Sequence, residues 1–176
     1  MSTIGEKLSL VRPAMDYELT YAAMLDECHA LDEDTANSVD QGFAALVKRL
    51  TDMEHGIGIR EDFVPQTTFW MVRDGSEVIG EVRLRHRLNS WLEQMGGHIG
   101  YVIRPSERRK GYGTRILEMA LDEARTIGLT RALVTCDPDN IGSARIIERN
   151  GGVRDVDSQD PETGRLTLRY WIDLCD

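Results

Sequence analysis

The chain has 176 residues, of which 41% are hydrophobic and 29% are charged, and its formal net charge at pH 7 is −9. This length and composition are typical of a single globular domain spanning residues 1–176. The negative charge argues against nucleic acid or an anionic membrane as a partner, because both would repel the protein. No apolar run is long enough to span a bilayer, and the first residues lack the pattern of a signal peptide.

Three cysteines, Cys28, Cys136 and Cys175, are scattered along the chain in no paired spacing. Such a set argues against a disulfide framework or a zinc site and is typical of a reducing compartment. We therefore expect a cytoplasmic protein without a metal ion. Cys136 closes an apolar run, which favours a small buried residue over a reactive nucleophile.

The first third of the chain predicts one strand and two helices. A strand is expected at residues 8–11, and the apolar spacing that follows predicts a helix over residues 19–31. The expected inward positions of that helix are Leu19, Ala22, Ala23, Leu25 and Leu31. A second helix is expected at about residues 41–53, with Asp40 as its N-cap. Its expected apolar face consists of Phe43, Leu46, Val47 and Leu50.

The middle of the chain predicts a series of strands. Residues 68–72 and 78–84 are strand-like and flank Asp74-Gly75, which is a strong hairpin signal. A connection over residues 85–95 leads to a further strand at residues 98–103.

The last part alternates helices and strands. Helical spacing over residues 116–127 ends at Gly128, a buried strand follows at residues 129–136, and a short helix is expected at residues 143–149. A closing hairpin pairs residues 153–156 with 166–174. Because a strand–helix–strand unit is parallel, the order of elements predicts an α/β (α+β) fold with a mixed, mostly antiparallel sheet of about seven strands and helices on both faces.

A glycine-containing turn joins the strand at residues 98–103 to the helix at residues 116–127. It contains three consecutive cations and two glycines, Arg108, Arg109, Lys110, Gly111 and Gly113. Glycine lacks Cβ, so a ligand can approach the backbone closely, and the helix N-terminus adds unpaired N–H groups. Strand, turn and helix together predict a phosphate site. A solvated surface turn is the alternative for the cations alone.

Two other phosphate-binding motifs fit this turn less well. A Walker loop needs Gly-x-x-x-x-Gly-Lys-Ser/Thr, which the chain does not contain. A dinucleotide fingerprint needs a third glycine where this chain has Ile116, and we expect that side chain to obstruct close packing of the helix on the strand.

Residues 108–113 are similar to the acyl-CoA loop of the GNAT superfamily of N-acetyltransferases, Gln/Arg-x-x-Gly-x-Gly/Ala. Downstream, residues 140–145 and 148–151 resemble the Asn-x-x-Ser/Ala segment of that family with its short helix and glycine. The resemblance covers residues 67–174 well. It implies a GNAT-like fold whose parallel strands splay apart at the CoA site, and acetyl-CoA as the cosubstrate.

The resemblance also implies roles for individual residues. The pyrophosphate of acetyl-CoA would be held by the backbone N–H groups of Arg109, Lys110, Gly111, Tyr112, Gly113 and Thr114. Arg108 and Lys110 would add positive charge. The pantetheine arm would pair with the backbone of Tyr101 and Ile103 like an added strand. Asn140 would bond an amide of the cofactor, and Ser143 belongs to the same segment.

The acceptor in this family is normally an amine. A free alkyl amine has a pKa of about 10, so a base must remove a proton before the amine attacks the thioester. Glu81 and His98 are the candidate bases. Glu81 is alternatively an exposed carboxylate or a partner of Arg83 or Arg85, and His98 is alternatively bonded within the sheet. Tyr101 is a further candidate to contact substrate, with core packing as the alternative.

One position departs from the family pattern. Many members carry a tyrosine, thought to protonate the leaving thiolate, where this chain has Ile147. Two functions therefore stay open, an N-acetyltransferase that acts on a primary amine of a small molecule or peptide by direct attack, and a catalytically silent CoA-binding or regulatory module.

The acceptor itself is not specified by the sequence. Phe69, Trp70 and Trp91 either line an acceptor pocket or fill the core. Edge strands and the closing hairpin are compatible with a homodimer, which no residue pattern demands.

Overall fold

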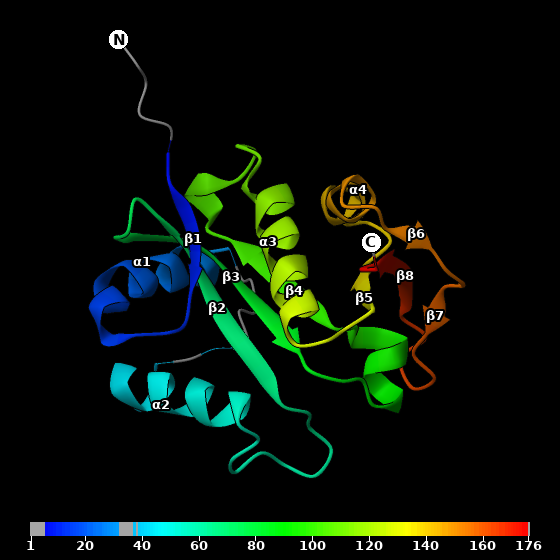
Figure 1. Cartoon of the computed structure of the whole chain (residues 1–176), viewed down its shortest axis with the longest axis horizontal. Helices are drawn as coiled ribbons and strands as arrows, with labels where there is room; N and C mark the ends of the chain where they lie inside the picture. The colour runs from blue at the N-terminus through cyan, green and yellow to red at the C-terminus, as the bar shows by residue number, and fades with distance from the viewer. Residues whose placement is uncertain (1–5, 32–36, 38, 176) are drawn as a thin grey trace.

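Figure 1 shows the computed structural model of the chain, which describes residues 6–31, 37 and 39–175. The strands are β1 (Leu8–Val11), β2 (Gln66–Arg73), β3 (Glu77–Arg85), β4 (Ile99–Ile103), β5 (Arg131–Cys136), β6 (Val153–Arg154), β7 (Ser158–Gln159) and β8 (Leu166–Asp173). The α-helices are α1 (Glu18–His29), α2 (Phe43–Glu54), α3 (Tyr112–Thr126) and α4 (Ile141–Arg149). Short helical turns are η1 (Met15–Tyr17), the π-helical η2 (Leu92–Gly96) and η3 (Pro105–Glu107).

The strands form one sheet in the order β1-β2-β3-β4-β5-β8-β6, and β7 pairs with β8 beside this path. Within the described residues every pairing is antiparallel except that of β4 with β5. The predicted mixed, mostly antiparallel sheet is therefore confirmed. Its one parallel step is the crossover through α3, which is the unit that carries the glycine turn.

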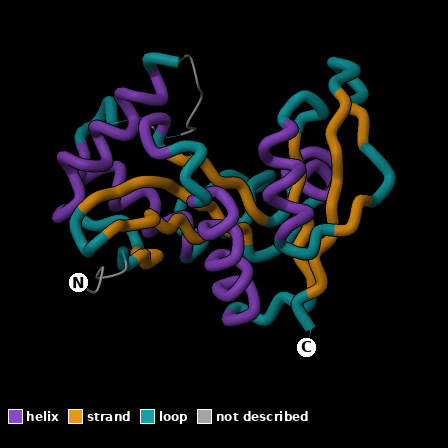
Figure 2. Tube along the Cα trace, turned by 90° about the horizontal axis from the view of Figure 1, so that it is seen from above, coloured by secondary structure: helices purple, strands orange, loops and turns teal. Residues whose placement is uncertain are grey.

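Helices cover both faces of the sheet. α1 and α2 bury one face in a core cluster that includes Tyr21, Leu46 and Trp70. α3 covers the opposite face and packs in a second cluster with Val82 and Ile99. Seen from above in Figure 2, the chain forms two diverging arms, with α1 and α2 in one arm and the strands from β5 onward in the other. The divergence begins where β4 meets β5.

The buried face of α1 differs from the predicted one. Its buried side chains are Tyr21, Met24, Leu25 and Cys28. Leu25 is buried as predicted, whereas the predicted inward residues Leu19 and Leu31 are 87% and 55% exposed. Both sets follow helical spacing, and the sheet decides between them because the Tyr21 ring stacks on Trp70 with 4.1 Å between ring centroids.

The predicted face of α2 is confirmed, since Phe43, Leu46 and Leu50 are buried and Val47 packs against the same cluster. Its predicted cap is wrong. Gly42 occupies the N-cap position with a φ of 91°, and no side chain caps the helix.

α3 lies close to β3 in spite of Ile116, contrary to the expectation from its bulk. Ile116 is fully buried, and a Cβ added to Gly80 of β3 would lie 3.1 Å from its Cδ1 atom. The glycine that permits close packing of helix on strand is therefore on the strand. Gly113 also serves packing, because an added Cβ would lie 2.5 Å from Cδ1 of Ile146 in α4.

Gly97 fixes the approach of β4 to β5. Its φ of 63° and ψ of −172° belong to a region that is essentially restricted to glycine. A Cβ at this position would lie 2.5 Å from the carbonyl oxygen of Leu133 in β5. The backbone of the two strands can thus meet closely only because residue 97 has no side chain.

We expect Gly97→Ala to lower the free energy of unfolding by about 3 kcal/mol, because backbone strain and a contact with backbone add together. Gly75→Ala is the matched control, since Gly75 has a φ of 75° with no atom within 4 Å of an added Cβ. Gly75→Ala should lower the free energy of unfolding by only about 1 kcal/mol, because it adds backbone strain without a steric contact. Urea denaturation of both variants measures the difference, and equal losses would contradict the close approach.

Candidate functional site

The parallel strands β4 and β5 pair at Ile99 and Val134 and separate beyond that point. On the other side of β4, the Arg85 N–H donates to His98 O and the Arg104 N–H donates to Ile79 O, 2.8 and 2.9 Å apart. Because antiparallel pairing alternates, Gly100 and Val102 also face β3. The backbone groups of Tyr101 and Ile103 therefore point into the gap toward β5. The sequence singled out these two residues for pairing with an extended ligand.

The glycine turn ends in an open helix N-terminus. Gly111 is the N-cap of α3 with a φ of 92°, and no side chain caps the helix. The backbone N–H groups of residues 109–114 donate no hydrogen bond within the described part of the chain. Arg109 has a φ of 66°, a left-handed conformation that is uncommon for residues other than glycine. The turn thus presents a row of unsatisfied donors, which is the arrangement that binds phosphate.

A buried ion-pair network holds this turn in place. Glu107 is 8% exposed and accepts hydrogen bonds from Arg73 and from Lys110, each at 2.9 Å. The Tyr112 hydroxyl donates to Glu6 at 2.6 Å, on the side of β1 and β2. The Tyr112 side chain therefore anchors the helix, and the ammonium of Lys110 is paired with Glu107. Arg108 donates through Nε to the carbonyl oxygen of Ile103 at 3.0 Å.

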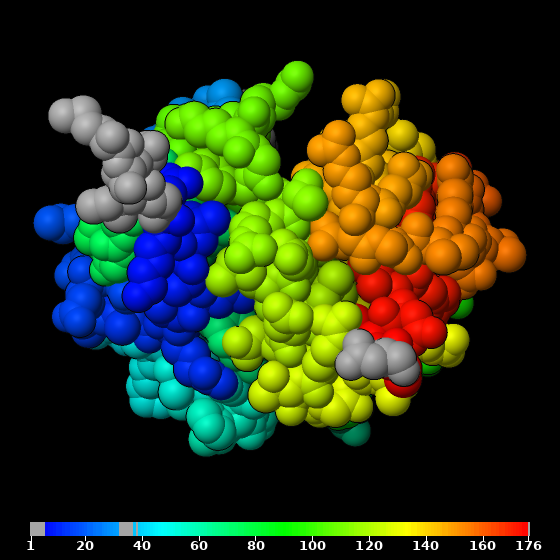
Figure 3. All heavy atoms as spheres, turned by 45° about the horizontal axis from the view of Figure 1, so that its top comes forward, coloured from blue at the N-terminus to red at the C-terminus, as the bar shows by residue number. Residues whose placement is uncertain are grey.

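A cavity of about 510 Å³ opens where β4 and β5 diverge. It is lined by residues of β3, η2, β4, β5, α4 and the turn between β7 and β8, among them Arg83, Trp91, Gly100, Tyr101, Thr135, Cys136, Asn140, Ser143 and Arg165. Figure 3 shows the surface hollowed between the green segment that carries the glycine turn and the orange segment that includes α4. We call the cavity the inter-strand cleft.

Tyr101 and Ser143 meet in this cleft. Their hydroxyl oxygens are 2.9 Å apart. Burial raises the pKa of Tyr101 to about 12, so its hydroxyl keeps its proton at neutral pH. Asn140 lines the cleft at the start of α4, where its Oδ1 accepts the Ser143 N–H at 3.0 Å as a helix cap. Ile147 is fully buried one turn later and offers no polar group.

Glu81 is buried, and its carboxylate is bonded to side chains of the protein core. It is 1% exposed and accepts hydrogen bonds from the Tyr21 hydroxyl at 2.6 Å and from Asn37 at 2.8 Å. The Trp70 indole donates a third at 3.2 Å. Burial raises the pKa of Glu81, although the nearby charge of Arg83 opposes that rise. The alternative of an exposed carboxylate is therefore wrong, whereas the alternative of an ion pair with Arg83 is confirmed, with Arg83 Nε 3.6 Å from Glu81 Oε1.

His98 lies directly before β4 and is bonded to β5. Its ring Nδ1 accepts the backbone N–H of Leu133 at 2.9 Å, and the backbone N–H of His98 donates to the carbonyl oxygen of Leu133 at 2.7 Å. Burial, together with the charges of Arg85 and Arg131, lowers the pKa of His98 to about 4. The imidazole is neutral at pH 7. Neither His98 nor Glu81 is among the side chains that line the inter-strand cleft.

A family model described as an acetyltransferase (GNAT) domain matches residues 17–153. The chain belongs to the GNAT acetyltransferase family. It is therefore an acyltransferase, and the expectation drawn from the glycine turn and the Asn140 segment is confirmed at the level of the family. No curated protein matches the chain.

Solved structures share the fold of this acetyltransferase at low sequence identity. The microcin C7 self-immunity acetyltransferase MccE, solved with acetyl-CoA and AMP, superposes with a TM-score of 0.68 at 16% identity over 95% of this chain and 92% of its own. RimJ of Mycobacterium smegmatis, solved with CoA-disulfide, gives 0.66 at 21% identity over 96% and 81%. The ribosomal-protein-S5-alanine acetyltransferase of Vibrio fischeri gives 0.70 at 15% identity over 100% and 97%.

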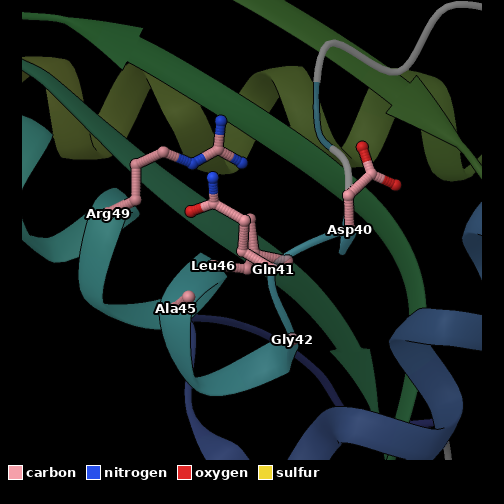
Figure 4. Close-up of a pocket in the computed structure, with 6 residues that line it drawn as sticks. All are labelled: Asp40, Gln41, Gly42, Ala45, Leu46 and Arg49. Atoms are coloured by element: carbon pink, nitrogen blue, oxygen red, sulfur yellow. The ribbon is translucent and has the colours of Figure 1, made fainter.

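A second hollow of about 190 Å³ lies at the start of α2, away from the predicted site residues. Figure 4 shows its lining, with Gln41 and Arg49 on one side and Asp40 across from them. Among the residues that the structure describes, no cluster of three or more potential metal ligands occurs. No helix of that described part is long and apolar enough to cross a membrane.

Some cleft residues of the acetyltransferase were not singled out by the sequence. The sequence indicates Arg83 only as a partner of Glu81 and indicates no role for Arg165. Trp91 is 60% exposed and lines the cleft, whereas Phe69 and Trp70 fill the core. Alternation along β3 places Arg83 on the same face as Glu81, but only the sheet register shows that this face continues into the cleft.

The low pKa of His98 predicts a pH-dependent stability. A histidine titrates near 6.5 in the unfolded chain and near 4 here, so the unfolded state binds more protons between these values. Stability should be complete above about pH 6.5 and fall as the pH drops toward 4.

We expect His98→Gln, whose amide oxygen can accept the Leu133 N–H, to flatten this dependence by up to about 2 kcal/mol between pH 7 and pH 5. Chemical denaturation at several pH values measures it. If the free energy of unfolding changed with pH equally in the wild-type protein and in His98→Gln, the result would contradict a neutral, buried imidazole.

Proposed function

We propose that this acetyltransferase binds acetyl-CoA along the gap between β4 and β5 and transfers the acetyl group to a primary amine of a small molecule or peptide by direct attack. The observation that carries the proposal is the alignment of two backbone surfaces on one gap. The Ile103 carbonyl oxygen already accepts Arg108 Nε, but a carbonyl oxygen can accept a second donor. The donors of residues 109–114 suit a pyrophosphate, and the outward backbone of Tyr101 and Ile103 suits an extended amide chain.

The charged and polar groups nearby support this placement. Arg108 and Arg109 add positive charge at the turn in a protein whose net charge is −9. Asn140 and Ser143 would face the amide groups of the cofactor from the opposite side of the gap, since both line the cleft. The proposed reaction requires no metal ion.

Acetyl-CoA supplies the acetyl group as a thioester. The Tyr101 N–H, directed into the gap, would donate to the carbonyl oxygen as negative charge develops on it. As the amine nitrogen bonds to the acetyl carbon, the bond to sulfur breaks. The Tyr101 hydroxyl, protonated and held by Ser143, would donate a hydrogen bond to the departing sulfur and so take the place of the tyrosine absent at Ile147.

We propose that water in the cleft takes the proton from the amine. Glu81 and His98 lie outside the cleft lining, and the carboxylate of Glu81 already accepts three donors. Their role in the proposal is to position neighbouring elements. Glu81 joins α1, β2 and β3, and His98 joins β4 to β5.

An amine-panel acetylation screen with mass detection and a thiol-release assay tests the function. The solved relatives act, by their printed names, on a ribosomal protein and on spermidine, so the panel should include peptides, polyamines and amino acids. Transfer to any amine rejects the silent CoA-binding module. Binding of acetyl-CoA without transfer to any amine would reject the enzyme.

Acetyl-CoA at 100 times its Kd should add about 2.7 kcal/mol to the free energy of unfolding. We expect Gly111→Ala to weaken acetyl-CoA binding about tenfold, because Ala disfavours the φ of 92° that aligns the donors. Gly128→Ala is the control, since Gly128 has a φ of 88° and open surroundings at the far end of α3. Calorimetry measures both affinities, and equal weakening would contradict a cofactor role for the turn.

We expect Tyr101→Phe to lower kcat about 10- to 100-fold while acetyl-CoA affinity stays within about twofold, because the hydroxyl acts on the developing thiolate. Ser143→Ala should lower kcat by a smaller factor, since this variant keeps the Tyr101 hydroxyl. Steady-state kinetics and calorimetry separate the two quantities. An unchanged kcat in Tyr101→Phe would reject the proposed role.

A further inference from the structure

Arg83 is a cation in the inter-strand cleft that donates no hydrogen bond to any residue that the structure describes. Its Nε atom is buried, and within the described part of the chain neither Nε nor the two other guanidinium nitrogens has a hydrogen-bond acceptor. Its closest carboxylate oxygen belongs to Glu81, 3.6 Å from Nε, which is beyond hydrogen-bond range. Glu81 is meanwhile occupied by Tyr21, Asn37 and Trp70.

The other charged side chains of the cleft are already matched. Arg165 forms an ion pair with Asp137, in which both carboxylate oxygens of Asp137 lie 2.7 Å from Nη2. Asp160 accepts the backbone N–H groups of Glu162 and Thr163, each at 2.9 Å. Among the described lining residues, Arg83 is thus the charge that lacks a counterpart with good geometry.

The surroundings of Arg83 leave room for a ligand. Gly100, its neighbour across β3 and β4, would carry a Cβ with no atom within 4 Å. Thr68, its neighbour across β2 and β3, has a buried hydroxyl that also lacks a partner. Cross-strand neighbours share one face of a sheet, so Thr68 and Arg83 are adjacent on the same face.

Arg83 is also close to the reacting position. Its cross-strand partner Gly100 directly precedes Tyr101, whose N–H is proposed to bind the thioester oxygen. An amine that attacks there would place a group two or three bonds away beside the guanidinium. Guanidinium binds carboxylate through two parallel hydrogen bonds.

We propose that the acceptor is an amine with a carboxylate next to it, as in an α-amino acid, and that Arg83 binds this carboxylate. The inference rests on the proposed function for its reacting geometry. It disfavours polyamines, which would bring further positive charge to Arg83. Trp91 and Met95 line the same cleft and suit an apolar side chain, so phenylalanine and methionine are appropriate probes.

The test compares each amino acid with its amide, which has nearly the same shape without the charge. We expect kcat/KM for phenylalanine and methionine to exceed that for their amides by about ten- to hundredfold. Arg83→Gln should bring the ratio close to one, and Arg83→Lys should keep part of it. Arg165→Gln is the control in the same cleft and should keep the preference. An amide accepted as well as its amino acid, or a preference that survives Arg83→Gln, would overturn the inference.

Calorimetry separates this inference from the proposed function. Phenylalanine is titrated into the protein saturated with CoA, and phenylalaninamide into a second sample. Tighter binding of phenylalanine that disappears in Arg83→Gln supports the carboxylate site even if no acetyl transfer occurs. Transfer to amines without any carboxylate preference leaves the proposed function in place and rejects the role of Arg83.

Discussion

The single contact between the parallel strands β4 and β5 governs the rest of this structure. Ile99 pairs with Val134. Just before that point, the His98 ring accepts the backbone N–H of Leu133, and the backbone N–H of His98 donates to the carbonyl oxygen of Leu133. Gly97 allows the strands to approach this closely. Beyond the contact the strands separate, and the free backbone edge of β4 faces the gap. The proposed cofactor site and the proposed acceptor site both depend on this divergence.

Two buried carboxylates connect the helices to the sheet around the gap. Glu107 joins the glycine turn to Arg73 of β2, and Glu81 joins α1 to β2 and β3. A buried carboxylate is unfavourable unless donors surround it, and each of these has several. Such groups specify where the loop and helix sit, because a shift would leave a charge without partners. Arg83, whose ion pair with Glu81 spans 3.6 Å, also lines the cleft.

The sequence predicted the elements of the site better than their contacts. The glycine turn, its helix and the Asn140 segment lie where the pattern placed them, because local spacing and backbone chemistry specify such motifs. The predicted inward face of α1 was wrong in part: Leu25 is buried, but Leu19 and Leu31 are exposed, since two apolar stripes fit the same helical period and the stacking of Tyr21 on Trp70 selected one. The cap at Asp40 was wrong because Gly42 ends the preceding turn. The environments of Glu81 and His98 depended on residues distant in the sequence.

The sequence by itself determined the fold class, the position of the glycine turn and the membership of the acetyltransferase family, because these follow from short-range periodicity and from residues close together in the chain. Only the tertiary structure decided which polar groups are satisfied. It paired Tyr101 with Ser143, Glu81 with Tyr21 and Asn37, and Arg165 with Asp137, and among the described residues it gave Arg83 no hydrogen-bond acceptor. Hydrogen bonds and ion pairs across a sheet depend on register and burial, which the order of residues alone does not specify.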